Sequence, residues 1–246
     1  MKPHDMTREL IRELEDLFAR KRLLAGRRDA ESMFRARVRD LRTWQARRLA
    51  RTYSDMRREP RFRRAIDFFL NDLYGPQDRA RRDDELMRAW RYLKRSLPEA
   101  ALRVLGEAME LELLTQELDE QMVGVLPPGP LTTETYSAAY RAVGRRQSRL
   151  RQIDLVVGIG EQLDRLRRHA WIGHALRVAH RPAHGAGFGV LHDFLERGFD
   201  AFRRMKGAES FLRTIRDRET RLMDDLLAGR EGPFREVAGR VSVNDA

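Results

Sequence analysis

The sequence predicts an all-α protein, a multi-helix bundle of about nine or ten helices. Three observations lead to this fold class. Apolar residues recur at intervals of three and four along almost the whole chain, no segment shows the alternating pattern of a half-buried strand, and glycine and proline fall between the periodic segments. A chain of 246 residues, 41% of them hydrophobic, is long enough to enclose a substantial core.

Five helices are predicted before residue 127, and the first two can pair as an N-terminal helical hairpin. Thr7 can cap the first helix and Gly26 can end it, while Pro60 suits the first turn of the third. Carboxylates at residues 83–85 suit the positive end of the dipole of the fourth helix. The expected ranges are about 7–24, 29–56, 60–74, 83–97 and 98–125.

The strongest break in the chain is Pro127-Pro128-Gly129-Pro130. It is a candidate boundary between an N-terminal helical subdomain (1–126), which contains the basic hairpin, and a C-terminal helical subdomain (131–229). The remaining residues, 230–246, are expected to form a flexible tail. Alternatively, the break joins two packed helices of a single domain.

Five further helices are predicted after this break. Thr132 or Thr133 can cap the first, Pro182 can open the fourth, and Gly229 can close the last. The expected ranges are about 133–143, 150–166, 172–178, 182–205 and 208–228.

The composition excludes several classes of protein. The chain has no Cys, so it has no disulfide scaffold, no thiolate zinc site and no Cys nucleophile. No stretch approaches the roughly 18 apolar residues of a membrane span, and no secretory signal pattern opens the chain. We therefore expect a cytoplasmic protein that does not interact with a membrane.

Two motifs resemble those of a known group of proteins. The first is Phe68-Phe69-Leu70-Asn71-Asp72-Leu73-Tyr74-Gly75-Pro76, and the second is Phe194-Leu195-Glu196-Arg197-Gly198-Phe199, followed by Gly207-Ala208, Phe211-Leu212, Ile215 and Arg218-Glu219. Together they resemble a family of uncharacterised all-helical bacterial proteins, over about residues 30–229. The resemblance implies a helical fold and a bacterial source, and it assigns no catalytic residue.

The positive charge is concentrated in one segment. The chain has a formal charge of +11, and residues 20–64 alone hold 17 basic and five acidic side chains. Because arginine pairs with phosphates, this segment is a candidate surface for DNA or RNA, with Arg47, Arg48 and Arg51 as binding residues. Alternatively, the aromatic residues of this segment belong to the inner face of a helix, and the excess of arginine over lysine reflects coding bias.

Five of the six histidines lie in the range 169–192. Neutral imidazole is a common metal ligand, so His184, His192 and Glu196 form a candidate metal or haem site. His192 and Glu196 are one helical turn apart and share a face. Pro182 is expected to break the helix between the histidines on either side of it. Because no histidine follows a carboxylate by three residues, as in helical di-iron proteins, surface histidines are the alternative and no cofactor is predicted.

Two other features are interpreted as structural. The glycine-rich residues 185–189 lack the strand and the lysine of a phosphate-binding loop, and favour close helix packing. A polar turn could place carboxylates for acid–base chemistry, but pairs with nearby arginines favour a structural role. This turn consists of Asn71, Asp72, Tyr74, Gly75, Pro76, Asp78 and Asp83.

No catalytic signature emerges from these patterns. The sequence therefore favours a non-catalytic helical interaction or regulatory protein that acts through its surfaces, with a protein partner or as a homodimer. Two alternatives stay open, namely binding of a nucleic acid through residues 20–64 and binding of a metal or haem.

Overall fold

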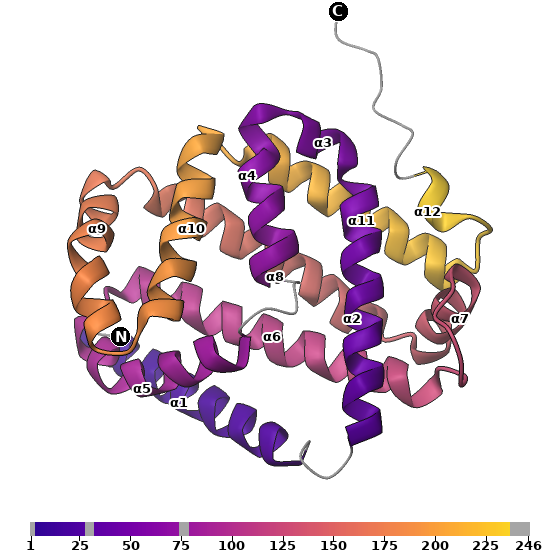
Figure 1. Cartoon of the computed structure of the whole chain (residues 1–246), viewed down its shortest axis with the longest axis horizontal. Helices are drawn as coiled ribbons and strands as arrows, with labels where there is room; N and C mark the ends of the chain where they lie inside the picture. Colours follow the sequence, from indigo (N-terminus) through magenta and orange to yellow (C-terminus); the bar gives the residue numbers. More distant parts are fainter. Residues whose placement is uncertain (1–2, 28–31, 74–78, 237–246) are drawn as a thin grey trace, which may run out of the picture.

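The computed structural model of the chain describes residues 3–27, 32–73 and 79–236. Within these ranges the protein contains ten α-helices of seven residues or more, together with shorter helical segments, and no strand (Figure 1). The predicted all-α class and the expected number of helices are therefore confirmed.

The helices follow one another with short connections. Those before the proline-rich break are α1 (Pro3–Arg27), α2 (Ser32–Thr52), α3 (Ser54–Arg58), α4 (Pro60–Phe68), the π-helix η2 (Phe69–Leu73), α5 (Arg79–Ser96) and α6 (Glu99–Val125). Those after it are α7 (Thr133–Val143), α8 (Arg146–Leu166), α9 (Ala170–Gly185), α10 (Gly189–Met205), α11 (Glu209–Ala228) and α12 (Pro233–Glu236).

The helices are arranged in two crossing layers (Figure 1). In one layer, α11, α8, α6 and α1 lie side by side. In the other, α9, α10 and α4 are neighbours, and α2 runs in the same general direction at the edge. The described parts of α1 and α2 each pack against α6 and make few contacts, if any, with one another, so they are not packed along each other as the predicted N-terminal hairpin requires.

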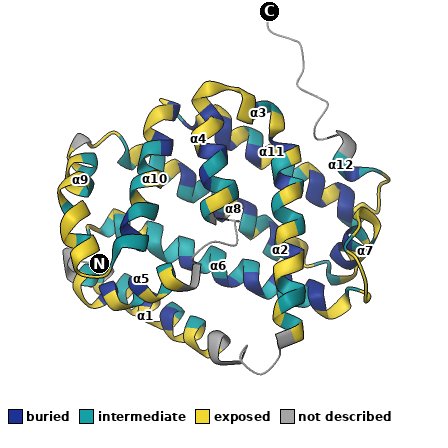
Figure 2. Ribbon diagram, viewed as in Figure 1, coloured by how far each residue is buried: buried dark blue, intermediate teal, exposed yellow. Residues whose placement is uncertain are grey.

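Three clusters of buried apolar side chains hold the layers together, and Figure 2 shows the buried residues on the inward sides of the helices. The first cluster joins α4 and α10 to α8 and α11, and includes Phe62, Phe202 and Phe211. The second joins α2 and α6 to α7, α8 and α11. Because both draw side chains from either side of residues 127–130, the proline-rich segment does not separate two hydrophobic cores.

The ends of several helices follow the expected chemistry. The hydroxyl of Thr132 accepts a hydrogen bond from the backbone N–H of Thr135 at 3.2 Å, and the hydroxyl of Thr135 accepts one from the N–H of Thr132 at 2.9 Å. This capping box begins α7. Gly229 ends α11 with a φ of 70°, a conformation that glycine adopts without strain.

Some boundaries differ from the prediction. The expected helix over 29–56 is interrupted at Tyr53, which separates α2 from α3, and the expected helix after Pro60 continues as the π-helix η2. The helix α9 runs through Pro182 to Gly185 instead of ending before it. Proline removes one backbone hydrogen bond, and the packing of α9 along α10 offsets this loss.

The tail is described as far as residue 236. The ring of Phe234 in α12 packs edge-on against Trp44 at 5.5 Å, and Arg230 pairs with Asp225 at 2.6 Å. Residues 237–246 lie outside the described residues. None of the described helices has a stretch that is both long and apolar enough to cross a membrane.

Candidate metal centre

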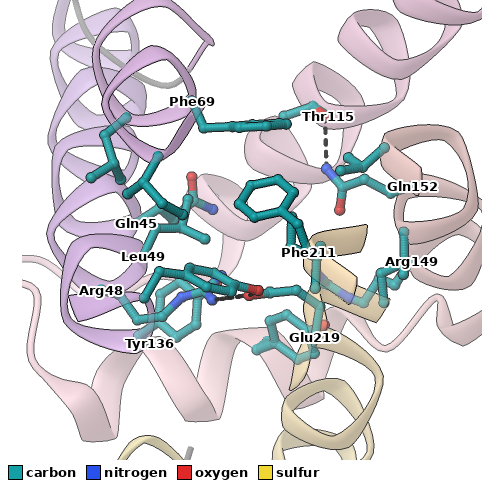
Figure 3. Close-up of a pocket in the computed structure, with 17 residues that line it drawn as sticks. Gln45, Arg48, Leu49, Phe69, Thr115, Tyr136, Arg149, Gln152, Phe211 and Glu219 are labelled. Atoms are coloured by element: carbon teal, nitrogen blue, oxygen red, sulfur yellow. Dashed lines mark hydrogen bonds and ion pairs between the residues drawn. The ribbon is translucent and has the colours of Figure 1, made fainter. Parts of the chain in front are cut away.

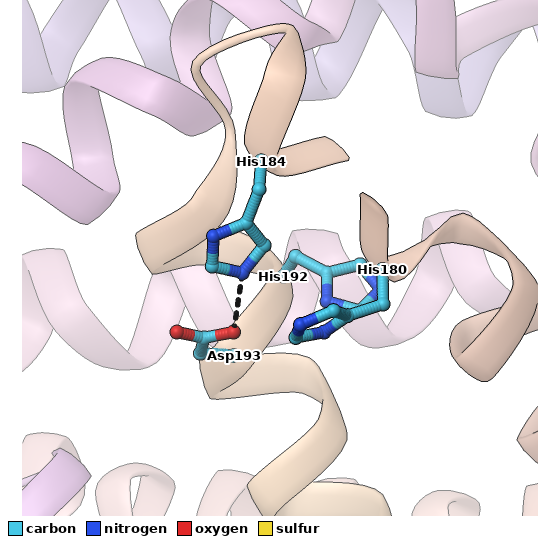
Figure 4. Close-up of side chains that lie close together, drawn as sticks. All are labelled: His180, His184, His192 and Asp193. Carbon is cyan, nitrogen blue, oxygen red and sulfur yellow. Dashed lines mark hydrogen bonds and ion pairs between the residues drawn. The ribbon is translucent and has the colours of Figure 1, made fainter. Parts of the chain in front are cut away.

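The helices α9 and α10 form an antiparallel hairpin that gathers four potential metal ligands (Figure 4). Because α9 continues through Pro182, His180 and His184 lie one turn apart on the same face of the helix. A three-residue connection then places His192 and Asp193 in the first turns of α10. The facing ligand atoms of these four side chains all lie within 4.8 Å of one another.

His192 is the buried member of the cluster, with 6% of its side chain exposed. Its Nε2–H donates a hydrogen bond to the backbone oxygen of Leu176 at 2.9 Å, which assigns the proton to Nε2 and leaves a lone pair on Nδ1. Nδ1 is buried and has no hydrogen-bond partner in the described parts of the chain. A backbone carbonyl that holds one imidazole nitrogen while the other is free is the arrangement found behind metal-bound histidines.

Two carboxylates face the imidazoles. Oδ1 of Asp193 lies 2.8 Å from Nε2 of His184. Oε2 of Glu196 lies 3.3 Å from Nδ1 of His180 and 3.9 Å from Nδ1 of His192. The cluster therefore combines three imidazoles with two carboxylates, and its net charge is negative when the imidazoles are neutral.

The absence of a side chain at Gly189 makes room for one of the ligands. A Cβ atom at this position would lie 2.8 Å from Nδ1 of His184. Gly185, which was expected to share a packing role, has no atom within 4 Å of the equivalent position. Of these two glycines, only Gly189 is needed to leave space for the histidine cluster.

A buried carboxylate fixes the start of α10. Glu85 of α5 is 1% exposed, and its Oε2 accepts a hydrogen bond from the backbone N–H of Leu191 at 2.8 Å. The first N–H groups of a helix lack partners within the helix, and the residue before α10, Phe188, provides no side-chain cap. Glu85 supplies this cap from another helix and so positions the turn that carries His192.

The geometry suits a small metal ion. Ligands of one tetrahedral zinc ion lie about 3.3 Å apart, because Zn–N and Zn–O bonds measure about 2.0–2.2 Å. Side-chain movements of about 1 Å would bring the cluster to this spacing. The side chains of His180 and His184 are 48% and 43% exposed, so an ion can enter from solvent.

The predicted site and the observed cluster overlap. Of the three predicted residues, His184 and His192 belong to the cluster, and Glu196 lies beside it, 3.9 Å from Nδ1 of His192. His180 and Asp193 are not among the predicted ligands. The spacing of four between His180 and His184 indicates a shared helix face only if the helix continues through Pro182, which it does.

The whole cluster lies within one recognised domain. Residues 25–233 match the domain of unknown function DUF8198. The chain belongs to this family. No curated protein and no solved structure matches the chain. The DUF8198 match covers nearly the same residues as the resemblance found in the sequence.

The three arginines predicted to bind a polyanion do not share one surface. Arg47 and Arg51 are exposed on α2, whereas Arg48 points inward and its Nη1 donates to the two oxygens of Glu219 at 2.7 and 2.9 Å. Burial disfavours the charge of Arg48, but Glu219 outweighs this effect and raises the pKa of Arg48. Other basic residues of the segment pair with α6, namely Arg20 with Glu117, Lys21 with Glu112 and Arg42 with Asp119.

Four residues of the predicted structural turn, Tyr74, Gly75, Pro76 and Asp78, lie outside the described residues. Asn71 and Asp72 belong to η2, and Oδ1 of Asp72 accepts a hydrogen bond from Nε of Arg197 at 2.8 Å. Asp83 lies on α5 and pairs with Lys21 at 2.8 Å. Burial and a neighbouring glutamate raise the pKa of Asp83.

Proposed function

We propose that the protein binds a divalent transition metal ion between α9 and α10. The observation that carries the proposal is the buried Nδ1 of His192, which lies 3.9 Å from Oε2 of Glu196 and has no hydrogen-bond partner among the described residues. A buried polar atom without a partner is unfavourable, and a metal ion would satisfy it. His180 and His184, with Asp193 or Glu196, would complete the coordination.

Zinc is the best match to this set of donors. Imidazole suits Zn²⁺, Cu²⁺, Ni²⁺ and Fe²⁺, and three imidazoles with one carboxylate satisfy the four-coordinate preference of Zn²⁺. Haem fits less well, because its iron uses one or two axial ligands inside an apolar slot. Here three imidazoles converge on one point, and two of them are largely exposed.

Metal binding would give the expected regulatory role a physical basis. Ligands from both α9 and α10 would be held by one ion, which would fix α9 against the rest of the fold. We propose that metal occupancy controls the order of this hairpin, and through it contacts with a protein partner or a second copy of the chain. A bacterial source and a cytoplasmic location are also proposals, supported by the two sequence motifs and by the composition.

The test is a calorimetric titration of chelator-treated protein with Zn²⁺. We expect one saturable site, and we expect His192→Ala to weaken the affinity by at least about 100-fold. His174→Ala is the matched control, because His174 is an exposed histidine of α9 outside the cluster. His184→Ala, at an exposed ligand, repeats the test without disturbing the core.

Two results would refute the proposal. One is the absence of a saturable zinc site in the folded wild-type protein. The other is an equal affinity in the His174→Ala and His184→Ala variants.

A further inference from the structure

A second candidate site lies in the interior, and none of the clustered histidines lines it. Side chains of α2, α4, η2, α6, α7, α8 and α11 surround a cavity of about 110 Å³. Figure 3 shows Arg48 and Arg149 on opposite sides of this space, with Glu219 between them and the rings of Phe69 and Phe211 on the other side. The cavity thus has a charged end and an apolar end.

Arg149 is a buried cation in this cavity, with 4% of the residue exposed. Its Nε donates a hydrogen bond to the backbone oxygen of Gly144 at 2.9 Å, and its guanidinium carbon lies 3.4 Å from the ring centroid of Tyr140. Its Nη2 is buried without a hydrogen-bond partner, and no carboxylate among the described residues pairs with it. Because arginine keeps its charge in proteins, an unpaired buried guanidinium favours an anionic partner.

Arg48 adds a second donor to the same space. Glu219 balances its charge, and the hydroxyl of Tyr53 also donates to Glu219 at 2.9 Å. Nevertheless, Nε of Arg48 is buried, and no described residue forms a hydrogen bond with it. Two arginines and one glutamate leave the lining with one net positive charge, which a single monoanion would neutralise.

The remaining lining limits the size and the character of this anion. Leu49, Ile66, Ile153, Val156 and Phe211 form apolar walls. A cavity of about 150 Å³ holds benzene in a well-studied protein, so a cavity of about 110 Å³ suits about four to six non-hydrogen atoms. A simple inorganic ion would leave the apolar walls without contacts.

We propose that this cavity binds a small monocarboxylate with a short hydrocarbon tail. The carboxylate accepts a hydrogen bond from Nη2 of Arg149, the arginine that Glu219 does not pair with, and the tail lies against Phe69 and Phe211. The site is independent of the proposed metal centre.

The test is a calorimetric titration of the full-length protein, in the presence of a chelator, with butyrate, butyramide and inorganic phosphate. Butyramide has nearly the shape of butyrate without its charge. We expect butyrate to bind at least about 10-fold more tightly than butyramide, because charged hydrogen bonds are the stronger ones. Butyrate should also bind more tightly than phosphate and than octanoate, which is too long for the cavity.

Each opposite result would overturn part of the reasoning. No binding of butyrate would refute the site, equal binding of butyramide would refute the role of charge, and tighter binding of phosphate would refute the role of the apolar walls. Arg149→Met should weaken butyrate binding at least about 10-fold. Arg146→Met, at an exposed arginine of the same helix, should leave it unchanged. Equal binding by these two variants would also refute the site.

Discussion

The ion pair between Arg48 and Glu219 offers a quantitative test of the fold. The two side chains are only 13% and 18% exposed, and Glu219→Gln removes the negative charge while nearly keeping the shape. Removing one partner of a buried pair costs about 3–5 kcal/mol, because the other charge stays buried and uncompensated. We expect the lower end, about 3 kcal/mol, because some water reaches Glu219 and the glutamine can still bond Tyr53.

For a domain of this size, each kcal/mol lowers the melting temperature by about 2–4 °C, so the expected decrease is about 6–12 °C. Thermal unfolding followed by circular dichroism measures it. Glu209→Gln is the matched control, since Glu209 is an exposed residue of the same helix that pairs with exposed Arg213. This change should cost less than about 1 kcal/mol. Equal decreases in the two variants would show that the buried pair does not contribute as reasoned.

Three further predictions concern the metal site and the response to pH. Saturating the protein with Zn²⁺ at about 100 times its dissociation constant should add about 2.7 kcal/mol to the free energy of unfolding measured in urea, and acidification that protonates the imidazoles should abolish this gain. Gly189→Ala should displace His184 and weaken zinc binding in calorimetry, whereas Gly185→Ala should not. The hydrogen bonds from Arg218 lower the pKa of Asp55 below its unfolded-state value of about 3.9. The pair therefore stabilises the fold at a pH above about 3.9, and this stabilisation is lost as the pH falls below that value. Asp55→Asn should therefore reduce the fall in the urea-derived unfolding free energy between about pH 5 and pH 3.

The sequence predicts most of the helices because their apolar residues and their caps act locally. The capping threonine of α7 and the closing glycine of α11 set boundaries that the structure reproduces closely. The packing between helices that are distant in the sequence is not determined by such local signals. The order of α1 and α2 in the chain suggested a hairpin, but both helices find a larger apolar partner in α6.

The candidate metal site could be predicted only in part for a similar reason. The pair His192 and Glu196 shares one helix, so its spacing was visible in the sequence. The contribution of His180 depends on a helix that continues through Pro182, which local rules disfavour. Packing against α10 decides this outcome, and no local pattern records that contact.

The inward direction of Arg48 was visible in principle. This residue follows Trp44 by four positions and Leu41 by seven, so it falls on the inner stripe of α2. In a segment with 17 basic residues, most of which face solvent, this spacing alone does not distinguish one buried arginine from its exposed neighbours. The burial of Arg149 depends on the ring of Tyr140, against which its guanidinium packs, and no spacing rule predicts this contact.

Arg48 and Glu219 are separated by 171 residues in the chain. At about 5–20 residues per second, the ribosome needs roughly 9–34 seconds to make the glutamate after it has made the arginine. Throughout this interval α2 lacks the carboxylate that neutralises its buried charge, and its apolar stripe lacks the side chains of α11. The cluster of α1, α5 and α6 contains only N-terminal side chains and can pack before then, so we expect the delay to concern α2, which completes its native packing only after α11 has been made.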